Sequence, residues 1–505
     1  MNRFKGKKIL IFQQRDWAKH VGHFLAKKMR DEGCELSAVT LKRRTHKFIT
    51  LQKEVKYHYV VNIDDIVENP EKYLVNENVT LDEICREFNI DSVWPMLHAN
   101  RYLTRSYRRK FYYGYGKNVS DEFMVSYIKA YYVALRDLFA KFKPDMVIIV
   151  AFVSDEHMML KHFADKYKIP ILATADTKVP EFYTFAYDEM VKKGDFRDRF
   201  FELQNGAKSD NIGKAKQFIA EFKEKFKAPV YPDDKTKKIS WIKKIRHELS
   251  PYKQIFDWYT KELPSMNYIK SVGPTIDYKP PKIILRDFYC QKKYEKFAKN
   301  YKYYPLEKAG KFVFYPLKYT PEGNMDLMCP LYNNQIELAR QIAMSLPGDY
   351  TLVIKEHWGM VGLRTPSYLE KVDRTPNVQL VDYRIPSEEL IKKSDMVIST
   401  FSTCFFEAAF YNKPAIMFSD SGIFEMLPNV FRHTDPATLS GKIKEVLSAD
   451  LKTEAYERQL ENFITAVYDV GFNFDYSAAW LGEKKDLEEL WQIYKKELEK
   501  WFAIN

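Results

Sequence analysis

The sequence predicts an α/β protein in which a helical segment connects two doubly wound domains. The chain has 505 residues, more than one hydrophobic core usually organises. Apolar, β-branched runs alternate with amphipathic helical runs; the alternation stops once near the middle and then resumes. The composition, 46% hydrophobic and 29% charged, is ordinary for a soluble globular protein. The longest apolar run, Met146–Val153, is too short to span a bilayer and suits a buried strand.

The predicted first domain covers residues 1–215 and begins with strand, helix and strand. A repeat of this kind is typical of parallel sheets whose faces are covered by helices. The same order returns twice, each time as a helix that leads into a strand. The expected elements are the strand Lys7–Phe12, the helix Arg15–Gly33, the strand Cys34–Leu41, and the two helix–strand units Tyr127–Phe152 and Asp155–Asp176.

Between residues 216 and 307 the alternation stops. This stretch is rich in lysine and tyrosine, carries several prolines and has a mostly helical pattern. We expect a helical insertion that connects the domains. Within it, Lys235–Arg246 ("KTKKISWIKKIR") interleaves Ile239 and Trp241 with basic residues, a pattern that predicts contact with anionic lipid.

The predicted second domain covers residues 308–480, and residues 481–505 form a long amphipathic C-terminal helix. The strand and helix runs alternate regularly here, which again indicates a doubly wound sheet. The expected strands are Lys311–Pro316, Tyr350–His357, Val378–Tyr383, Asp395–Thr400 and Pro414–Ser419.

The formal net charge of +12 requires an explanation. A solvated lysine-rich surface, an anionic membrane and a phosphorylated substrate each fit, whereas the motifs of nucleic-acid-binding modules are absent from the sequence. The five cysteines are scattered without metal-ligand spacing, which indicates reduced thiols and no metal site. The N-terminal apolar run is too short for a signal peptide, so we expect a cytoplasmic protein that can attach peripherally to the inner membrane face.

Polar residues follow four strands of the second domain. Ligands of open α/β sheets bind outside the carboxyl ends of the strands, so these positions predict a site. The residues concerned are Lys318 after the apolar run "KFVFY", Lys355, Glu356 and His357 after "TLVI", Asp382 and Tyr383 after "VQLV", and Ser399, Thr400, Ser402 and Thr403 after "MVI".

The stretch "STFSTCFFEAAFYNKP", residues 399–414, combines hydroxyl groups with one acid. Ser402 and Thr403 begin a helix and can donate hydrogen bonds to a phosphate, although plain helix capping explains them equally well. Glu407 stands too far along the helix for a capping box and has apolar neighbours. A carboxylate in such surroundings needs a partner, and a ribose diol can supply one.

The stretch "KEHWG" is the second cluster. His357 can donate to a phosphate or act as an acid toward a leaving nucleotide, while Lys355 and Arg364 can balance phosphate charge. The alternative is a surface pair of Lys355 and Glu356 beside a capping histidine.

These residues resemble the capsule-polysaccharide biosynthesis glycosyltransferases, which include the Kdo transferases. The resemblance covers about Lys311 to Phe418 and lies in "FYPLKYTPEGN", "YTLVIKEHWGMVGLR", "VQLVDY" and "EELIKKSDMVISTFSTCFFEAAFYNKPAIMF". It implies a GT-B fold: two Rossmann-like domains facing a cleft, with donor nucleotide on the C-terminal domain and acceptor on the N-terminal one. It also implies that Lys355, His357, Ser402 and Thr403 hold the donor phosphate and that Glu407 meets the nucleotide sugar. His357-Trp358 stands where the family often has His-Pro, and Lys318 where it often has His, which leaves the donor open.

The predicted function is therefore glycosyl transfer from a nucleotide sugar, CMP-Kdo-like or another, to a surface polysaccharide or glycolipid, without a metal or other cofactor. If the reaction inverts, the attacking hydroxyl needs a base; Asp176 and then Asp155 are the candidates, each at a strand end. Three alternatives remain. They are a CDP-polyol phosphotransferase of the teichoic-acid type, a sugar-nucleotide epimerase of the same fold, and a non-catalytic basic binding module.

Overall fold

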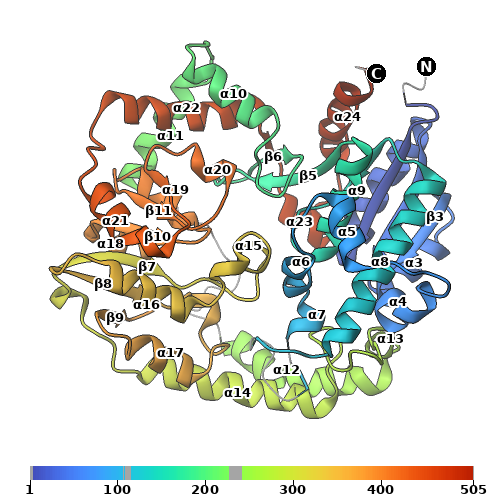
Figure 1. Ribbon diagram of the computed structural model, residues 1–505, viewed down its shortest axis with the longest axis horizontal. Helices are drawn as coiled ribbons and strands as arrows, with labels where there is room; N and C mark the ends of the chain where they lie inside the picture. The colour runs from blue at the N-terminus through green and yellow to red at the C-terminus, as the bar shows by residue number, and fades with distance from the viewer. Residues whose placement is uncertain (1–3, 106, 109–114, 227–240, 504–505) are drawn as a thin grey trace.

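The computed structural model describes residues 4–105, 107–108, 115–226 and 241–503. Two sheets of mainly parallel strands form the cores of two domains, and helices cover both faces of each sheet (Figure 1). A set of helices along the lower edge of Figure 1 connects the domains. The predicted α/β class, with two Rossmann-like domains in a GT-B arrangement, a helical insertion and a C-terminal helix, is thereby confirmed.

The first sheet has the order β13-β6-β5-β4-β1-β2-β3. The strands from β5 to β3 are parallel, β6 is antiparallel to β5, and β13 is antiparallel to β6. The strands are β1 Lys8–Gln14, β2 Glu35–Leu41, β3 Tyr57–Asn62, β4 Met146–Ile148, β5 Ile171–Asp176, β6 Phe182–Ala186 and β13 Phe472–Asn473.

The two faces of the first sheet are covered by different helices. Because side chains alternate along a strand, Leu10 and Phe12 of β1 pack toward α8 and α9, while Ile9 and Ile11 pack toward α2 and α24. The helices before the connection are α1 Arg15–Trp17, α2 His23–Asp31, α3 Arg43–Leu51, α4 Ile63–Glu68, α5 Leu81–Phe88, α6 Trp94–Ala99, α7 Arg101–Thr104, α8 Asp121–Phe142 and α9 Asp155–Tyr167, with a π-helical turn at Ala18–Gly22.

The second sheet is entirely parallel and has the order β12-β11-β10-β7-β8-β9. In chain order this is 3-2-1-4-5-6, the arrangement of dinucleotide-binding Rossmann domains. The strands are β7 Lys311–Pro316, β8 Tyr350–Lys355, β9 Val378–Val381, β10 Met396–Ser399, β11 Ala415–Met417 and β12 Val430–Arg432.

The second sheet is also covered on both faces. Phe312 and Phe314 of β7 pack with α10, α11, α19 and α22, whereas Val313 and Tyr315 pack with α16, α17 and α21. The helices are α10 Asp195–Gln204, α11 Ile212–Glu224, α15 Gly323–Asp326, α16 Gln335–Ser345, α17 Pro366–Asp373, α18 Ser387–Lys393, α19 Thr403–Ala409, α20 Gly422–Glu425, α21 Leu439–Leu447 and α22 Glu454–Val470.

The chain passes between the domains at positions that differ from the predicted boundaries. Helices α10 and α11 pack on the second domain, so the first domain ends before residue 195 and not at 215. After α22 the chain returns: β13 joins the first sheet, and α23 (Tyr476–Leu481) and α24 (Glu488–Ala503) pack on it, so the second domain ends before 480. Buried apolar side chains such as Phe196 and Tyr494 hold these helices in place. Sequence periodicity shows that such side chains are buried, but not in which of the two cores.

The connection consists of α12 (Trp241–Thr260), α13 (Leu263–Met266) and α14 (Pro281–Asn300). Helix α12 packs on α14, α13 contacts α3 of the first domain, and α14 contacts α17 of the second. Residues 235–240, the start of the predicted lipid-contacting segment, lie outside the described residues. No helix in the described part of the chain combines the length and apolar character that crossing a bilayer requires.

Candidate functional site

The polar strand ends of the second domain gather at the point where the order of the strands in the sheet reverses. The strand order reverses between β7 and β10, and ligands of such sheets bind outside the carboxyl ends at that point. Lys318 follows β7, Lys355 ends β8, and Glu407 lies one turn into the helix after β10. The charges of both lysines act on Glu407, so these three predicted residues come together.

Loops from the strand ends of both sheets meet between the domains. Gly323 begins α15, which lies between the domains in Figure 1, and a Cβ on this residue would lie 3.0 Å from the Cα of Val153. The same helix carries Asp326, which accepts a hydrogen bond from Arg105 Nη2 of the first domain at 2.7 Å in a buried ion pair. The carboxyl ends of the two sheets therefore face one another across α15.

Glu407 is a buried acid that forms no ion pair with any residue the structure describes. Its side chain is 6% exposed, and its Oε2 atom has no hydrogen-bond partner among the described residues. Burial raises its pKa to about 7, although the charges of Lys355 and Lys318 lower it in part. Leaving a carboxylate oxygen buried and unpaired costs free energy, so this atom marks a position that a ligand donor can satisfy.

The two lysines differ in how they are held. Lys355 is buried, and its Nζ donates to the Ile385 carbonyl at 3.0 Å and to Ser387 Oγ at 2.7 Å. Burial lowers its pKa. Lys318 is half-buried, and its backbone is fixed by Gln335, whose side-chain oxygen accepts from the Lys318 N–H at 2.6 Å. The Lys318 ammonium forms no hydrogen bond or ion pair with any described residue, so it is the cation that can meet a phosphate.

The hydroxyl groups at the end of β10 and the start of α19 differ in whether they form hydrogen bonds within the protein. Ser402 is the N-cap of α19, and its Oγ accepts from the Cys404 N–H at 3.3 Å; this capping is the alternative that the sequence left open. Ser399 is fully buried, and its Oγ has no hydrogen-bond partner among the described residues. Thr403 is half-buried in the first turn of α19. Contact of Ser399, Ser402 and Thr403 with a phosphate stays a prediction.

Glu356 and Arg364 are buried partners of one another. Arg364 Nη1 donates to both Glu356 carboxylate oxygens, at 3.0 and 3.2 Å, and Nη2 donates to the Lys318 carbonyl. Burial raises the pKa of Glu356, and the nearby guanidinium lowers it in part. The expected surface pair of Lys355 and Glu356 is not present. Glu356 and Arg364 instead tie the loop after β7 to the loop after β8, so they position Lys318.

His357 caps the short 3₁₀ turn Trp358–Met360. Its Nδ1 accepts from the Gly359 N–H at 3.1 Å, and this bond requires the tautomer with the proton on Nε2. Burial, aided by the charges of Lys318, Arg364 and Lys355, lowers its pKa to about 3. His357 is therefore neutral at pH 7: it can donate a hydrogen bond to a ligand, but it brings no positive charge and little acidity.

The two candidate bases of the first domain lie in opposite environments. Asp176, at the end of β5, is half exposed, accepts from the Lys178 N–H and pairs with Lys178 Nζ, both at 2.8 Å. Asp155 is fully buried and accepts from Asn100 Nδ2 and Tyr127 OH, each at 3.0 Å. Burial and the neighbouring Glu156 raise the pKa of Asp155 well above its usual range. Solvent contact favours Asp176 over Asp155 as the base.

Several groups near the site escaped the sequence reasoning. Gln335, which fixes Lys318, lies in a helix whose pattern shows only amphipathicity. Ser421 lies after β11, is buried, and its Oγ has no hydrogen-bond partner among the described residues. Its signal was available, because the hydroxyl lies just beyond the predicted strand Pro414–Ser419. The ion pair of Arg105 and Asp326 joins residues 221 positions apart, a distance over which periodicity carries no information.

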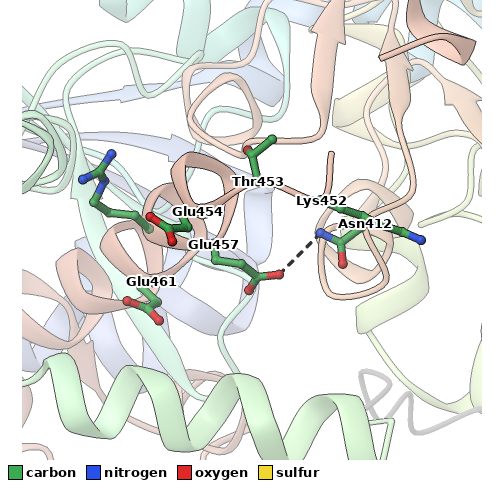
Figure 2. A pocket seen from close by; sticks show the side chains of 7 residues that line it. Asn412, Lys452, Thr453, Glu454, Glu457 and Glu461 are labelled. Atoms are coloured by element: carbon green, nitrogen blue, oxygen red, sulfur yellow. Dashed lines mark hydrogen bonds between the residues drawn. The ribbon is translucent and has the colours of Figure 1, made fainter. Parts of the chain in front are cut away.

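A surface hollow lies apart from these residues. A hollow of about 540 Å³ opens beside the start of α22 (Figure 2) and is lined by Asn412, Lys452, Thr453, Glu454, Glu457, Arg458 and Glu461. Asn412 precedes β11, so the hollow adjoins the amino ends of the strands, away from the switch point. Among the described residues no three His, Cys, Asp or Glu side chains converge as a metal site.

Comparisons with known proteins find fold-level likeness only. No family model matches the sequence, and a search of curated proteins gives no match. The beta Kdo 2,7 transferase KpsC of Thermosulfurimonas dismutans aligns with a TM-score of 0.34 at 10% identity, over 72% of this chain and 88% of that one. The UDP-GlcNAc 2-epimerase of Methanocaldococcus jannaschii aligns with a TM-score of 0.24 at 10% identity, over 90% and 97%. Likeness at this level bears on neither substrate nor reaction.

Proposed function

We propose that this protein is a sugar-nucleotide-dependent glycosyltransferase that binds its donor on the second domain and its acceptor on the first. The observation that carries the proposal is the unpaired, buried Oε2 of Glu407 beside Lys318 and Lys355, at the switch point of a sheet with Rossmann strand order. A ribose hydroxyl supplies the missing donor, and a diphosphate or phosphate ester supplies the anion that Lys318 lacks.

The division of roles follows from the arrangement of charges. Lys355 uses two of its three ammonium donors within the protein, and Lys318 uses none with a described residue. His357 adds a neutral donor at the end of the same strand as Lys355. On the first domain, Asp176 is a half-exposed carboxylate at a strand end, where it can accept the proton of an attacking acceptor hydroxyl.

The acceptor and the setting are also part of the proposal. A surface polysaccharide or glycolipid under construction at the cytoplasmic membrane face suits a protein with a net charge of +12. We expect transfer to proceed without a metal ion, because the lysines and neutral donors carry the leaving nucleotide. Full activity after dialysis against EDTA is the expected result.

A nucleotide-binding panel tests the proposal. Thermal shift and calorimetry with CMP, CDP, UDP, GDP and their sugars should find one base that stabilises the protein by about 2.7 kcal/mol at a hundred times its Kd. Glu407→Gln should weaken nucleoside and nucleotide alike, by about tenfold. Ser402→Ala with Thr403→Ala should weaken the nucleotide but not the nucleoside, because hydrogen bonds to charged groups contribute about 1.5–3 kcal/mol.

The control is Glu389→Gln on α18, which removes an acid that pairs with Lys393 on the surface at 2.7 Å. It should leave binding unchanged. Binding of no nucleotide, or equal binding by wild type and Glu407→Gln, contradicts the proposal. If a sugar nucleotide binds and its sugar is altered without any acceptor, the protein is an epimerase; if CDP-polyols bind and release CMP, it is a phosphotransferase.

A further inference from the structure

Helix α12 exposes a row of large apolar side chains. Their exposed fractions range from 47% to 72%, although the helix belongs to a domain connection that packs on α14. Soluble proteins seldom expose contiguous apolar patches of this kind unless something binds them. The residues are Trp241, Ile242, Ile245, Leu249, Tyr252, Phe256 and Tyr259.

These side chains form one continuous stripe. At about 100° per residue, the spacing of the seven positions places them within an arc of about 100° of the helix circumference. The stripe follows the whole of Trp241–Thr260, a length of about 30 Å at 1.5 Å per residue. Pro251, on the opposite side, is buried. In Figure 1 α12 lies with α14 at the lower edge of the molecule, away from both sheets.

The charges next to the stripe are positive. Arg246 and Lys253 lie on the turn beside it, are exposed, and form no ion pair within the described part of the chain. The helix acids are neutralised by lysines: Glu248 pairs with Lys292 of α14, and Asp257 pairs with Lys261 at 2.8 Å. The face that solvent meets is therefore apolar with unpaired cations at its border.

The aromatic residues favour one kind of partner. The stripe holds Trp241, Tyr252 and Tyr259, and Tyr289 of α14, 57% exposed, lies next to Tyr252. Trp and Tyr are enriched where a protein meets the headgroup region of a bilayer, since each has an apolar ring and a polar atom. An apolar stripe with basic borders is the pattern of helices that lie in the plane of that region.

We propose that α12 is a docking helix for an anionic lipid surface, lying parallel to the membrane with its apolar stripe among the headgroups. Arg246 and Lys253 bind the lipid phosphates. A second copy of this chain fits less well, because a symmetric contact would bring the same unpaired cations toward one another. The inference goes beyond glycosyl transfer: it stands whether or not Glu407 binds a nucleotide, and it places the first domain near a lipid-linked acceptor.

Vesicle sedimentation tests this inference with the full chain. Wild type should bind phosphatidylcholine vesicles that contain about a third phosphatidylglycerol, and should bind pure phosphatidylcholine far more weakly. Ile245→Gln, Leu249→Gln and Phe256→Gln together should lower the binding constant at least about tenfold. Arg246→Gln with Lys253→Gln should lower it about 30-fold at low salt, the equivalent of ~1 kcal/mol per basic residue.

A matched triple variant changes exposed apolar residues elsewhere: Leu51→Gln, Met344→Gln and Leu481→Gln, whose side chains are 64% to 67% exposed. It should bind vesicles as wild type does, and all variants should keep the wild-type melting temperature. Equal binding by wild type and the α12 triple variant overturns the inference. Wild-type binding that does not increase with anionic lipid overturns it as well. A dimer in light scattering that the α12 variant disperses would assign the stripe to a second copy instead.

Discussion

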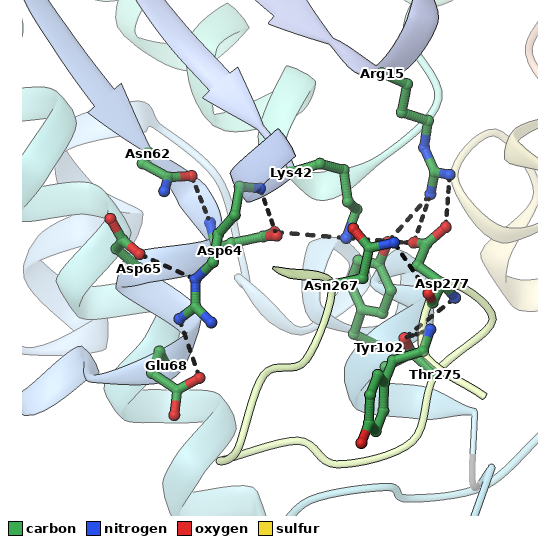
Figure 3. Close-up of polar contacts among 12 residues, drawn as sticks. Arg15, Lys42, Asn62, Asp64, Asp65, Glu68, Tyr102, Asn267, Thr275 and Asp277 are labelled. Carbon is green, nitrogen blue, oxygen red and sulfur yellow. Dashed lines mark hydrogen bonds and ion pairs between the residues drawn. The ribbon is translucent and has the colours of Figure 1, made fainter. Parts of the chain in front are cut away.

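At the strand ends of each domain a carboxylate lies near two cations, and the pKa values of the two carboxylates shift in opposite directions; Glu407 is buried, and Asp277 is half-buried. In the first domain Asp277, from the connection, receives both Arg15 guanidinium nitrogens at 2.8 and 3.0 Å and the Tyr102 hydroxyl, with Lys42 Nζ 3.3 Å away (Figure 3). Burial raises the pKa of Asp277, but the charges of Lys42 and Arg15 outweigh burial and bring it well below the usual range.

In the second domain the charges of Lys355 and Lys318 lower the pKa of Glu407, which forms no ion pair with a described residue. Burial raises the pKa by more, so that it reaches about 7. Distance and hydrogen bonding decide the difference, because a cation at contact distance offsets desolvation and a more distant one does not. The first cluster is complete and anchors the connection, whereas the carboxylate of the second finds no ionic partner in the part of the chain that the structure describes. A complete cluster is expected to stabilise the fold, and an incomplete one to bind a ligand.

The largest expected effect is on the complete cluster. Asp277→Asn should lower the free energy of unfolding at pH 7 by about 3 kcal/mol, because it leaves Arg15 and Lys42 without their shared carboxylate. Since the folded pKa is depressed, this contribution is present above the unfolded pKa of about 3.9 and disappears as pH falls through the folded pKa. Urea unfolding at several pH values measures it. Asp65→Asn, which removes an exposed pair with Arg43, should cost less than about 1 kcal/mol.

The incomplete cluster should respond in the opposite direction. Glu407→Gln should raise the free energy of unfolding at pH 8 by about 2 kcal/mol, since it removes the cost of burying an ionised carboxylate. Because the folded pKa is raised, the stability of wild type declines as pH rises from about 4.5 to about 7, and the gain should be small at pH 5. Urea unfolding at both pH values provides the test. A variant less stable at both would show that Glu407 holds structural hydrogen bonds instead.

Ligand affinity should follow the same titration. If Glu407 accepts bonds from a ribose, it must be ionised, so affinity for a sugar nucleotide should rise about tenfold between pH 6 and pH 8. A sugar nucleotide is the right probe, because its esterified phosphates do not titrate in this range. Calorimetry with Glu407→Gln should show weaker binding with no such pH dependence. If the variant keeps the pH dependence, the titration of another group causes it.

The smallest effects separate a satisfied serine from an unsatisfied one. Ser402→Ala should lower the free energy of unfolding by about 1 kcal/mol, because it removes the N-cap of α19. Ser399→Ala, which removes a buried hydroxyl with no partner among the described residues, should leave stability unchanged or slightly raise it. Thermal unfolding of the two variants under identical conditions compares them. Equal losses would show that Ser399 has a structural role.

Strand alternation was enough to predict the fold, and the polar strand ends were enough to predict which side chains share one edge of the second sheet. Lys318, Lys355 and Glu407 could be placed together, because parallel strands end at one edge. The partners of each group could not be predicted: Glu356 and Arg364 form a buried pair, and Asp155 lies beneath the surface, because such contacts depend on loop conformation. The domain boundaries moved for a related reason. An amphipathic helix such as α10 does not reveal in its sequence which of two sheets it covers.

The return of the chain to the first domain after α22 affects how the protein is synthesised. Strand β13 and helix α24 complete the first core, so Ile9, Ile11 and Trp17 are translated long before α23 and α24, which help to bury them. A nascent first domain must wait on the ribosome with this apolar face uncovered until α23 and α24 have been translated. Such surfaces attract chaperones and favour aggregation. Removing the last helix would therefore damage the domain that lies farthest from it along the sequence.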